Sequence, residues 1–332
     1  MTSEYSIRQY EKKDEAMWDE FVERTSINGT FLQSRRFLNY HPKDRFRDFS
    51  LIIEDSKGHI AAVCPACMID ENGERKFISH MGSTFGGLII SPKHYYAYKI
   101  IEIIQCVEGY LKGNNITYIE LRITPDLFAL KNSALLEYCL FYCGYQEFCE
   151  LSTYVDFSHY KESILSNFEQ GKRTNVHNCI KEGLSYRKIE STKELSTFYE
   201  LLCKNLLKYK AKPVHLISEL LDLKRNRLQE ETDFYGVFNG NEMIAGAMMF
   251  YFHRTNVAHT QYLCAEPQLH TLSPMTYLYF AMIKEMKEQG FSKISFGIST
   301  EDKGKTLNYG LTRSKEAYGG EHCINRKFCK NI

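Results

Sequence analysis

Long apolar runs are absent from this chain of 332 residues. No stretch is long enough to cross a membrane, and the N-terminal MTSEYSIRQYEKKDEAMW is charged and lacks the apolar core of a secretory signal. An excess of either charge is absent too, because 42 basic and 41 acidic residues leave a net charge of +1. We therefore expect a cytoplasmic protein with no membrane span and without the broadly basic surface of a DNA-binding protein.

The common catalytic signatures are also missing, since the sequence has no GxSxG elbow, P-loop or HExxH motif. The stretch CPAC (Cys64 to Cys67) has zinc-knuckle spacing, but no second CxxC and no HxxxH accompany it. The eleven cysteines are scattered along a large chain, which favours reduced thiols over a disulfide framework. We expect no metal site.

What is present is a globular composition, 43% hydrophobic and 25% charged, over a length that suits two domains. The predicted domains are residues 1–150 and 151–332, each large enough to bury its own core.

A repeat supports this division. Phe49 to Ile69 and Asp233 to Phe252 both read as a strand, a glycine turn and a second strand, with turns at Lys57-Gly58 and Asn239-Gly240. A long amphipathic helix and a β-branched strand follow each hairpin: KHYYAYKIIEIIQCVEGYLKGNN with ITYIELRI, then SPMTYLYFAMIKEMKEQG with FSKISFGI. An amphipathic helix precedes each one. The same order of elements thus occurs twice, which indicates a duplication.

This order resembles that of GNAT acyltransferases, and the tandem pair resembles the FemAB/FemX family and its BioF2-like acetyltransferase subgroup. The blocks that carry the resemblance are NGTFLQSRRFLNYH, SHMGSTFGGLI and FGISTEDKGKTLNYGLTRSKEAYGG. The resemblance implies an α+β fold of two tandem GNAT-like domains, each a mixed, mostly antiparallel sheet flanked by helices. It also implies an acyltransferase whose acyl donor lies where two strands splay apart.

The donor site is less clearly marked. A single-domain GNAT holds the coenzyme A pyrophosphate on a glycine-rich loop at a helix N-terminus, but AEPQLHTLSPMTYLYF (Ala265 to Phe280) contains no glycine. Ser273 is the predicted N-cap and cofactor-binding residue, with Pro274 in the first turn. We expect an acyl-CoA donor. Aminoacyl-tRNA, as in FemX-like enzymes, stays open but is disfavoured by the near-neutral charge and the lack of a coiled-coil arm.

Candidate acceptor-binding residues lie in three stretches. Arginines bind phosphate or carboxylate groups in bidentate fashion, and glycines allow a backbone to approach a ligand closely. A basic helix can meet phosphates, although each stretch also fits a plain turn or a solvated helix face. The candidates are Arg35, Arg36 and His41; Ser79, His80, Gly82, Thr84, Phe85 and Gly86; and Lys172, Arg173 and His177.

The chemistry is expected at the end of FSKISFGI. Glu301 or Asp302 would take the proton of the attacking amine, Lys305 would neutralise a phosphate or oxyanion, and Asn308 would orient the acceptor. His259, in a strand of the second repeat, is a further candidate base because its ordinary pKa is near neutral. The alternative is a solvated loop between two strands, with LTRSKEAYGG returning as the last strand.

Together these features predict an N-acyltransferase that uses a small-molecule acyl donor. The expected acceptor is an amino sugar, a sugar nucleotide or a cell-wall or polysaccharide precursor. The alternatives are an aminoacyl-tRNA-dependent transferase and a catalytically inactive module that binds a glycan precursor.

Overall fold

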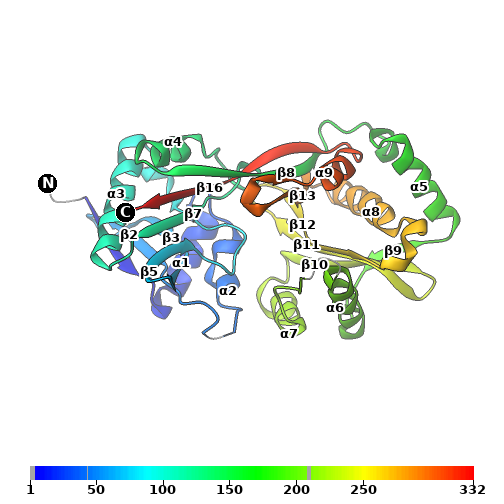
Figure 1. Cartoon of the computed structure of the whole chain (residues 1–332), viewed down its shortest axis with the longest axis horizontal. Helices are drawn as coiled ribbons and strands as arrows, with labels where there is room; N and C mark the ends of the chain where they lie inside the picture. The colour runs from blue at the N-terminus through cyan, green and yellow to red at the C-terminus, as the bar shows by residue number, and fades with distance from the viewer. Residues whose placement is uncertain (1–3, 43, 208–210) are drawn as a thin grey trace. The chain divides into compact units, whose positions relative to one another are not determined.

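The computed structural model describes residues 4–42, 44–207 and 211–332. The chain forms two compact units (Figure 1). Unit 1 comprises residues 1–150 and 324–332, and unit 2 comprises residues 151–323. The last nine residues, which the sequence assigned to the second domain, therefore fold into unit 1. The division between units falls within strands β8 (Gln146–Asp156) and β16 (Glu321–Asn331).

Unit 1 contains two groups of paired strands. The first is an antiparallel sheet of order β1-β2-β3-β6. The second has the order β4-β5-β7-β16, in which only β5 and β7 run parallel. The strands are β1 (Tyr5–Gln9), β2 (Leu51–Asp55), β3 (Ile60–Cys64), β4 (Ala66–Glu71), β5 (Glu74–Ser79), β6 (Ile89–Ile90) and β7 (Tyr118–Arg122).

Helices cover both faces of the first sheet. Neighbouring residues of β2 point to opposite sides of the sheet, and the residues on each side pack against a different helix. Ile52 packs with Trp18 of α1 (Glu15–Glu20), whereas Leu51 and Ile53 belong to the core that contains α3 (Ala97–Gly113). The inner face of α3 is buried at three-to-four spacing, as its sequence predicts. The other helices of this unit are α2 (Arg35–Leu38) and α4 (Ala134–Tyr142).

Unit 2 is built on a sheet of order β8-β13-β12-β11-β10-β9. All neighbouring strands are antiparallel except β12 and β13, which run parallel. The strands are β9 (Ser185–Lys188), β10 (Thr232–Asn239), β11 (Glu242–Phe252), β12 (Val257–Ala265) and β13 (Lys293–Ile298). A short hairpin of β14 (Thr300–Glu301) and β15 (Thr306–Leu307) follows β13.

Helices cover both faces of this sheet. On β10, Tyr235 belongs to the core with α5 (Gln170–Lys181) and α8 (Pro274–Glu288), while its neighbour Phe234 contacts Phe198 of α6. The remaining helices are α6 (Thr192–Leu207), α7 (Ile217–Asp222) and α9 (Tyr309–Glu316). Within the described residues, no helix is long and apolar enough to cross a bilayer.

Both predicted hairpins are present, and their turn glycines have positive φ, 78° at Gly58 and 58° at Gly240. One prediction was wrong: the stretch expected as the last strand, LTRSKEAYGG, lies mostly in helix α9. The helix begins because the Asn308 side chain accepts the Leu311 N–H, a strong N-cap. The last strand, β16, starts only at Glu321.

Close helix–sheet packing in unit 2 gives a stability prediction. A Cβ on Gly246 of β11 would lie 2.6 Å from Phe198 Cδ2 and 3.2 Å from the Tyr235 carbonyl oxygen. Gly246→Ala should therefore lower the free energy of unfolding by about 1–3 kcal/mol. The matched control is Gly109→Ala in α3, where a Cβ meets nothing within 4 Å. That change should raise the free energy by about 0.5–1 kcal/mol. Urea unfolding measures both, and equal effects would contradict the packing argument.

Candidate active site

The central feature of unit 2 is the point where its two parallel strands part. β12 and β13 pair only from Val257–Lys293 to His259–Ser295. Beyond that point β12 continues against β11, and β13 continues against β8. The backbone groups of β12 that face the opening have no ladder partner on β13. We call the residues around this parting the splay site: His259, Thr260, Ser295, Gly297, Ser299 and Lys315.

Irregular pairing marks both strands where they part. On β12 the register against β11 shifts between Met248 and Met249, and on β13 the register against β8 shifts between Ser295 and Gly297. Gly297 has a φ of 71°, which favours glycine. An extra residue bends its strand and increases its twist, so the two shifts direct the strands away from each other.

Polar side chains close the paired end of the opening. The Thr260 hydroxyl donates to the Ser295 carbonyl oxygen at 3.3 Å, and the Gly297 N–H donates to the Ser295 hydroxyl oxygen at 3.3 Å. His259 Nδ1 lies 3.1 Å from that same hydroxyl. The Ser295 hydroxyl hydrogen can thus be donated to Nδ1, which leaves the proton of a neutral imidazole on Nε2. Ser295 itself is fully buried, so it is poorly placed to act as a nucleophile.

Lys315, on helix α9, reaches the same place. Its Nζ donates to the carbonyl oxygens of Gly297 at 2.9 Å and Ile298 at 2.7 Å, and to Ser299 Oγ at 3.0 Å. The residue is only 3% exposed. All three hydrogens of an ammonium therefore have acceptors, and they fix the end of β13 to the helix.

The electrostatics of the splay site are unusual because the Lys315 partners are all neutral. None of the carboxylates in the described part of the chain forms an ion pair with this lysine. Burial lowers the pKa of Lys315 to about 8. Burial, followed by the nearby Lys315 charge, lowers the pKa of His259 to about 4. At neutral pH the site thus contains a cation without a counter-ion beside a neutral imidazole that is a weak base.

The acidic residues expected at the strand end lie further out. Glu301, Asp302 and Lys305 are all exposed, in or beside the β14–β15 hairpin. The Asn308 side chain donates to Glu301 Oε1 at 2.8 Å while it caps α9, so one amide orients the carboxylate and starts the helix. These candidates therefore form a solvent-facing group that starts at Glu301, two residues after Ser299 of the splay site.

The predicted phosphate-binding residues of unit 2 lie elsewhere. Ser273 is the N-cap residue of α8 and Pro274 follows in the first turn, as predicted, but Ser273 has a φ of 50° and its side chain forms no cap hydrogen bond. Lys172 donates to Ser314 Oγ at 3.1 Å and lies 4.6 Å from the centre of the Tyr318 ring. Burial lowers the pKa of Lys172. Arg173 is partly exposed and His177 is exposed, both on α5.

Unit 1 has a comparable parallel pair, β5 and β7, but here the chain fills the opening. Ser79 Oγ accepts N–H groups from Gly87 at 3.0 Å and Arg122 at 2.8 Å, and the Gly86 N–H donates to the Arg122 carbonyl at 2.7 Å. A Cβ on Gly87 would lie 3.2 Å from Ile123 Cα. The glycines therefore allow the loop to approach the protein's own strand, where the sequence predicted approach to a ligand.

The same loop is held to the segment after α2. His41 Nε2 donates to the Gly82 carbonyl at 3.0 Å, and the Gly82 N–H donates to His80 Nδ1 at 3.2 Å. Burial lowers the pKa of His80 to about 4, so this ring is neutral and carries its proton on Nε2. Thr84 is exposed, and Phe85 is buried against Phe128.

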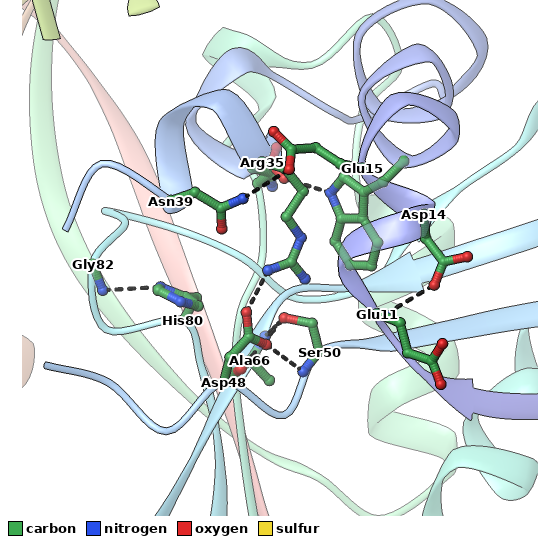
Figure 2. A network of polar contacts seen from close by, with 12 residues as sticks. Glu11, Asp14, Glu15, Arg35, Asn39, Asp48, Ser50, Ala66, His80 and Gly82 are labelled. Carbon is green, nitrogen blue, oxygen red and sulfur yellow. Dashed lines mark hydrogen bonds and ion pairs between the residues drawn. The ribbon is translucent and has the colours of Figure 1, made fainter. Parts of the chain in front are cut away.

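The two arginines of α2 are already engaged. Arg35 is fully buried and forms an ion pair with Asp48 (Figure 2). Its guanidinium carbon also lies 3.5 Å and 4.2 Å from the centres of the Tyr10 and Trp18 rings. Burial acts to raise the pKa of Asp48, but the Arg35 charge and the Ser50 contacts outweigh it and hold that pKa below its usual range. Arg36 binds both oxygens of Glu23. The Arg36 fork is occupied by Glu23, whereas Arg35 Nε and Nη2 have no hydrogen-bond partner but are enclosed in the interior, so neither guanidinium offers an open fork to solvent.

Sequence reasoning found only His259 of the splay site, and it missed Ser295 and Lys315 there and Asp48 in unit 1. Lys315 lay in a quoted block, and the helical spacing of Leu311, Thr312 and Lys315 was the available signal. Asp48 and Ser295 carry no local signal, because their partners are distant in the sequence. Among the described residues, no three His, Cys, Asp or Glu side chains gather as a metal site.

The buried His80 ring gives a prediction for acid stability. Its pKa is about 4 in the folded protein and 6.5 ordinarily, so the unfolded chain binds the proton first as pH falls. Stability is therefore lost between about pH 6.5 and 4, by about 3 kcal/mol for this residue. His80→Gln should remove that loss, whereas His177→Gln, on an exposed residue, should not. Urea unfolding at pH 7 and pH 4.5 measures it, and an unchanged pH dependence in His80→Gln would refute the assignment.

Comparison with known proteins agrees with this geometry. Residues 173–305 match the family model described as an acetyltransferase (GNAT) domain, a range that contains β12, β13 and the paired part of the splay site. No curated protein matches the chain in sequence.

Several solved structures share the fold along nearly the whole chain. FemX is 12% identical, with 98% of this chain and 97% of FemX covered and a TM-score of 0.69. A tandem GNAT protein from the clavulanic acid biosynthesis pathway is 8% identical, covers 99% and 98%, and has a TM-score of 0.59. L-PGS from Bacillus licheniformis is 11% identical, covers 97% and 92%, and also scores 0.59. The predicted α+β fold of tandem GNAT-like domains is confirmed, while the BioF2-like subgroup stays a prediction. Residues 173–305 are thus similar to a GNAT acetyltransferase domain, which indicates an acyltransferase.

Proposed function

We propose that this protein is a cytoplasmic N-acyltransferase that moves an acyl group from a coenzyme A thioester to an amine. The proposed acceptor is an amino sugar, a sugar nucleotide or a cell-wall or polysaccharide precursor. The amine attacks the thioester carbonyl carbon, the tetrahedral intermediate collapses, and the thiol of coenzyme A leaves with the amide formed. No covalent enzyme intermediate is needed, in keeping with the full burial of Ser295.

The observation that carries the proposal is the opening between β12 and β13. An extended donor can lie there because the parted strands leave backbone N–H groups of β12 without a ladder partner on that side. Such groups suit the oxygen of a thioester carbonyl. The comparable position in unit 1 is filled by Gly86 and Gly87, which supports a donor site in unit 2.

Lys315 acts in this scheme as a positioning residue. Its ammonium fixes the carbonyls at the end of β13, and its uncompensated charge makes the surroundings favourable for the negative charge of the transition state. His259, with its lowered pKa, is a poor proton acceptor at neutral pH. We assign the amine proton to Glu301 or Asp302, directly or through water, because both carboxylates lie next to the splay site.

Aminoacyl-tRNA, which carries an aminoacyl ester, is a second candidate donor in place of the coenzyme A thioester, and one observation favours it. The turn before α8 contains no glycine, so a glycine-rich phosphate cradle is lacking. The basic side chains of α5, including Arg173, and the exposed Lys305 are the proposed phosphate contacts for coenzyme A.

A donor and acceptor screen tests the proposal. Purified protein is incubated with acetyl-CoA or longer acyl-CoAs and a panel of amino sugars and UDP-amino sugars, and free thiol release is followed. Amine-dependent thiol release supports the proposal. If only an aminoacyl-tRNA supports transfer, the second donor is correct. If ligands shift the unfolding temperature but no donor turns over, the protein is the inactive binding module.

Replacing Lys315 tests the splay site directly. Lys315→Met removes the charge and the bonds to Gly297 and Ile298, so kcat should fall at least about 100-fold. The matched control, Lys303→Met, changes an exposed lysine in the nearby hairpin and should leave kcat within about twofold. Circular dichroism confirms folding of both. Equal rates for wild type and folded Lys315→Met would remove Lys315 from the mechanism.

The pH profile gives an independent test. Lys315 has a pKa of about 8, so its charge is present below pH 8 and lost above it. The catalytic rate with saturating substrates should therefore fall as pH rises through about 8. A Lys315→Met variant should lack this decline, since it has no group to titrate there. A decline of the same size and position in both proteins would assign it to another group.

A further inference from the structure

The β14–β15 hairpin brings two carboxylates close to the splay site, but only one of them is held in place. Glu301 ends β14, and the Asn308 side chain donates to its Oε1 at 2.8 Å. Asp302 starts the turn, and its carboxylate forms no hydrogen bond or ion pair with any residue that the structure describes. Proton transfer is efficient only from a side chain held in a fixed position, so this difference separates the two candidate bases.

The turn of the hairpin directs Asn308 to Glu301. Asp302 and Lys303 have φ values of 48° and 55°, which is an unfavourable conformation for residues other than glycine. This turn reverses the chain so that Thr306 pairs with Glu301, and Asn308 follows two residues later. Backbone strain of this kind persists only where the surrounding contacts enforce it, and it is common at functional sites.

Asn308 is itself fixed at both its backbone and its side chain. Its N–H donates to the Ser299 carbonyl oxygen at 3.0 Å, and its Oδ1 accepts the Leu311 N–H at 3.0 Å. Ser299 Oγ in turn accepts a hydrogen bond from the Lys315 ammonium at 3.0 Å. Hydrogen bonds through Ser299 and Asn308 therefore link the buried cation of the splay site to the Glu301 carboxylate.

The contact with Asn308 leaves half of the Glu301 carboxylate available. Asn308 occupies Oε1, and no other described residue donates to Oε2. Glu301 is exposed, so an amine that arrives from solvent can reach Oε2. The other titratable side chains of the splay site are less suitable. Burial lowers the pKa of His259 to about 4, which makes it a weak base, and Lys315 is a cation at neutral pH.

We propose that Glu301 is the catalytic base and that Asn308 is the residue that positions it. This assignment rests on the N-acyltransferase function proposed above and narrows it, because Asp302 is then not the base. As the amine nitrogen bonds to the thioester carbonyl carbon, one of its protons moves to Glu301 Oε2. The carbon–sulfur bond then breaks, the thiolate takes a proton from water, and Glu301 returns its proton to water. Asn308 thus acts through Glu301, whereas the sequence predicted direct contact with the acceptor.

Variants that keep the helix cap separate positioning from folding. Aspartate and serine cap a helix about as well as asparagine. In Asn308→Asp the donor to Glu301 is replaced by a carboxylate oxygen, and in Asn308→Ser the side chain is too short to cap α9 and reach Glu301 together. In both variants kcat should fall at least about tenfold, while the acceptor KM stays within about twofold and the urea unfolding midpoint is retained.

Replacing the two carboxylates tests the choice of base. Glu301→Gln should lower kcat at least about 100-fold, and Asp302→Asn should keep at least about ten times the kcat of Glu301→Gln. In the Glu301→Gln background, Asn308→Ser should cause no further loss, because its effect passes through the carboxylate. The matched control is Asn132→Ser, at an exposed position of unit 1, which should leave kcat within about twofold.

The results distinguish failure of this assignment from failure of the proposed function. If wild type transfers an acyl group from no donor, the proposed function is wrong and the assignment falls with it. If wild type is active but Asp302→Asn loses as much activity as Glu301→Gln, only the choice of base is wrong. If both Asn308 variants keep the wild-type kcat, or Asn308→Ser lowers the rate equally in the Glu301→Gln background, Asn308 is a helix cap and does not position the base.

Discussion

The buried ammonium of Lys315 is the interaction on which the geometry of the splay site depends. Three hydrogen bonds join it to the last residues of β13, and they hold that strand end in its diverging path after the pairing with β12 stops. A buried cation with only neutral partners is costly. Proteins tolerate such a cost chiefly where function requires it, and an acyl transfer that develops negative charge beside this cation would use it.

Both units have a buried serine that accepts a backbone N–H beside their parallel strand pair, but the surroundings of the pair differ between the units. In unit 1 the buried Ser79 hydroxyl accepts two backbone N–H groups near the end of the parallel pairing, and His80 follows it in the sequence. In unit 2 the buried Ser295 hydroxyl accepts one backbone N–H and contacts His259. In unit 1 the glycine loop occupies the opening, whereas in unit 2 the opening has no such loop. The loop of unit 1 can approach the strand this closely because Gly87 has no Cβ, which would lie 3.2 Å from Ile123 Cα.

Burial decides the protonation of both histidines. Water solvates an imidazolium much better than a protein interior does, so enclosure favours the neutral ring. His80 and His259 thus serve as hydrogen-bonding groups whose state is constant at neutral pH. The candidate bases, Glu301 and Asp302, are exposed and can therefore meet a substrate amine or a water molecule.

The sequence by itself determined the elements and their order. Hairpin glycines, three-to-four spacing in α3 and α8 and the β-branched strands after them are local signals, and the tandem GNAT-like fold followed from their repetition. Prediction from the sequence was wrong where local patterns were ambiguous. In α9, for example, the helix cap at Asn308 outweighed an apparent strand. Only the tertiary structure brought Lys315 to Gly297 and Ser295 to His259, and only it showed Arg35 buried against Asp48. Those pairs are separated along the chain, and burial with its effects on pKa arises only when distant segments pack together.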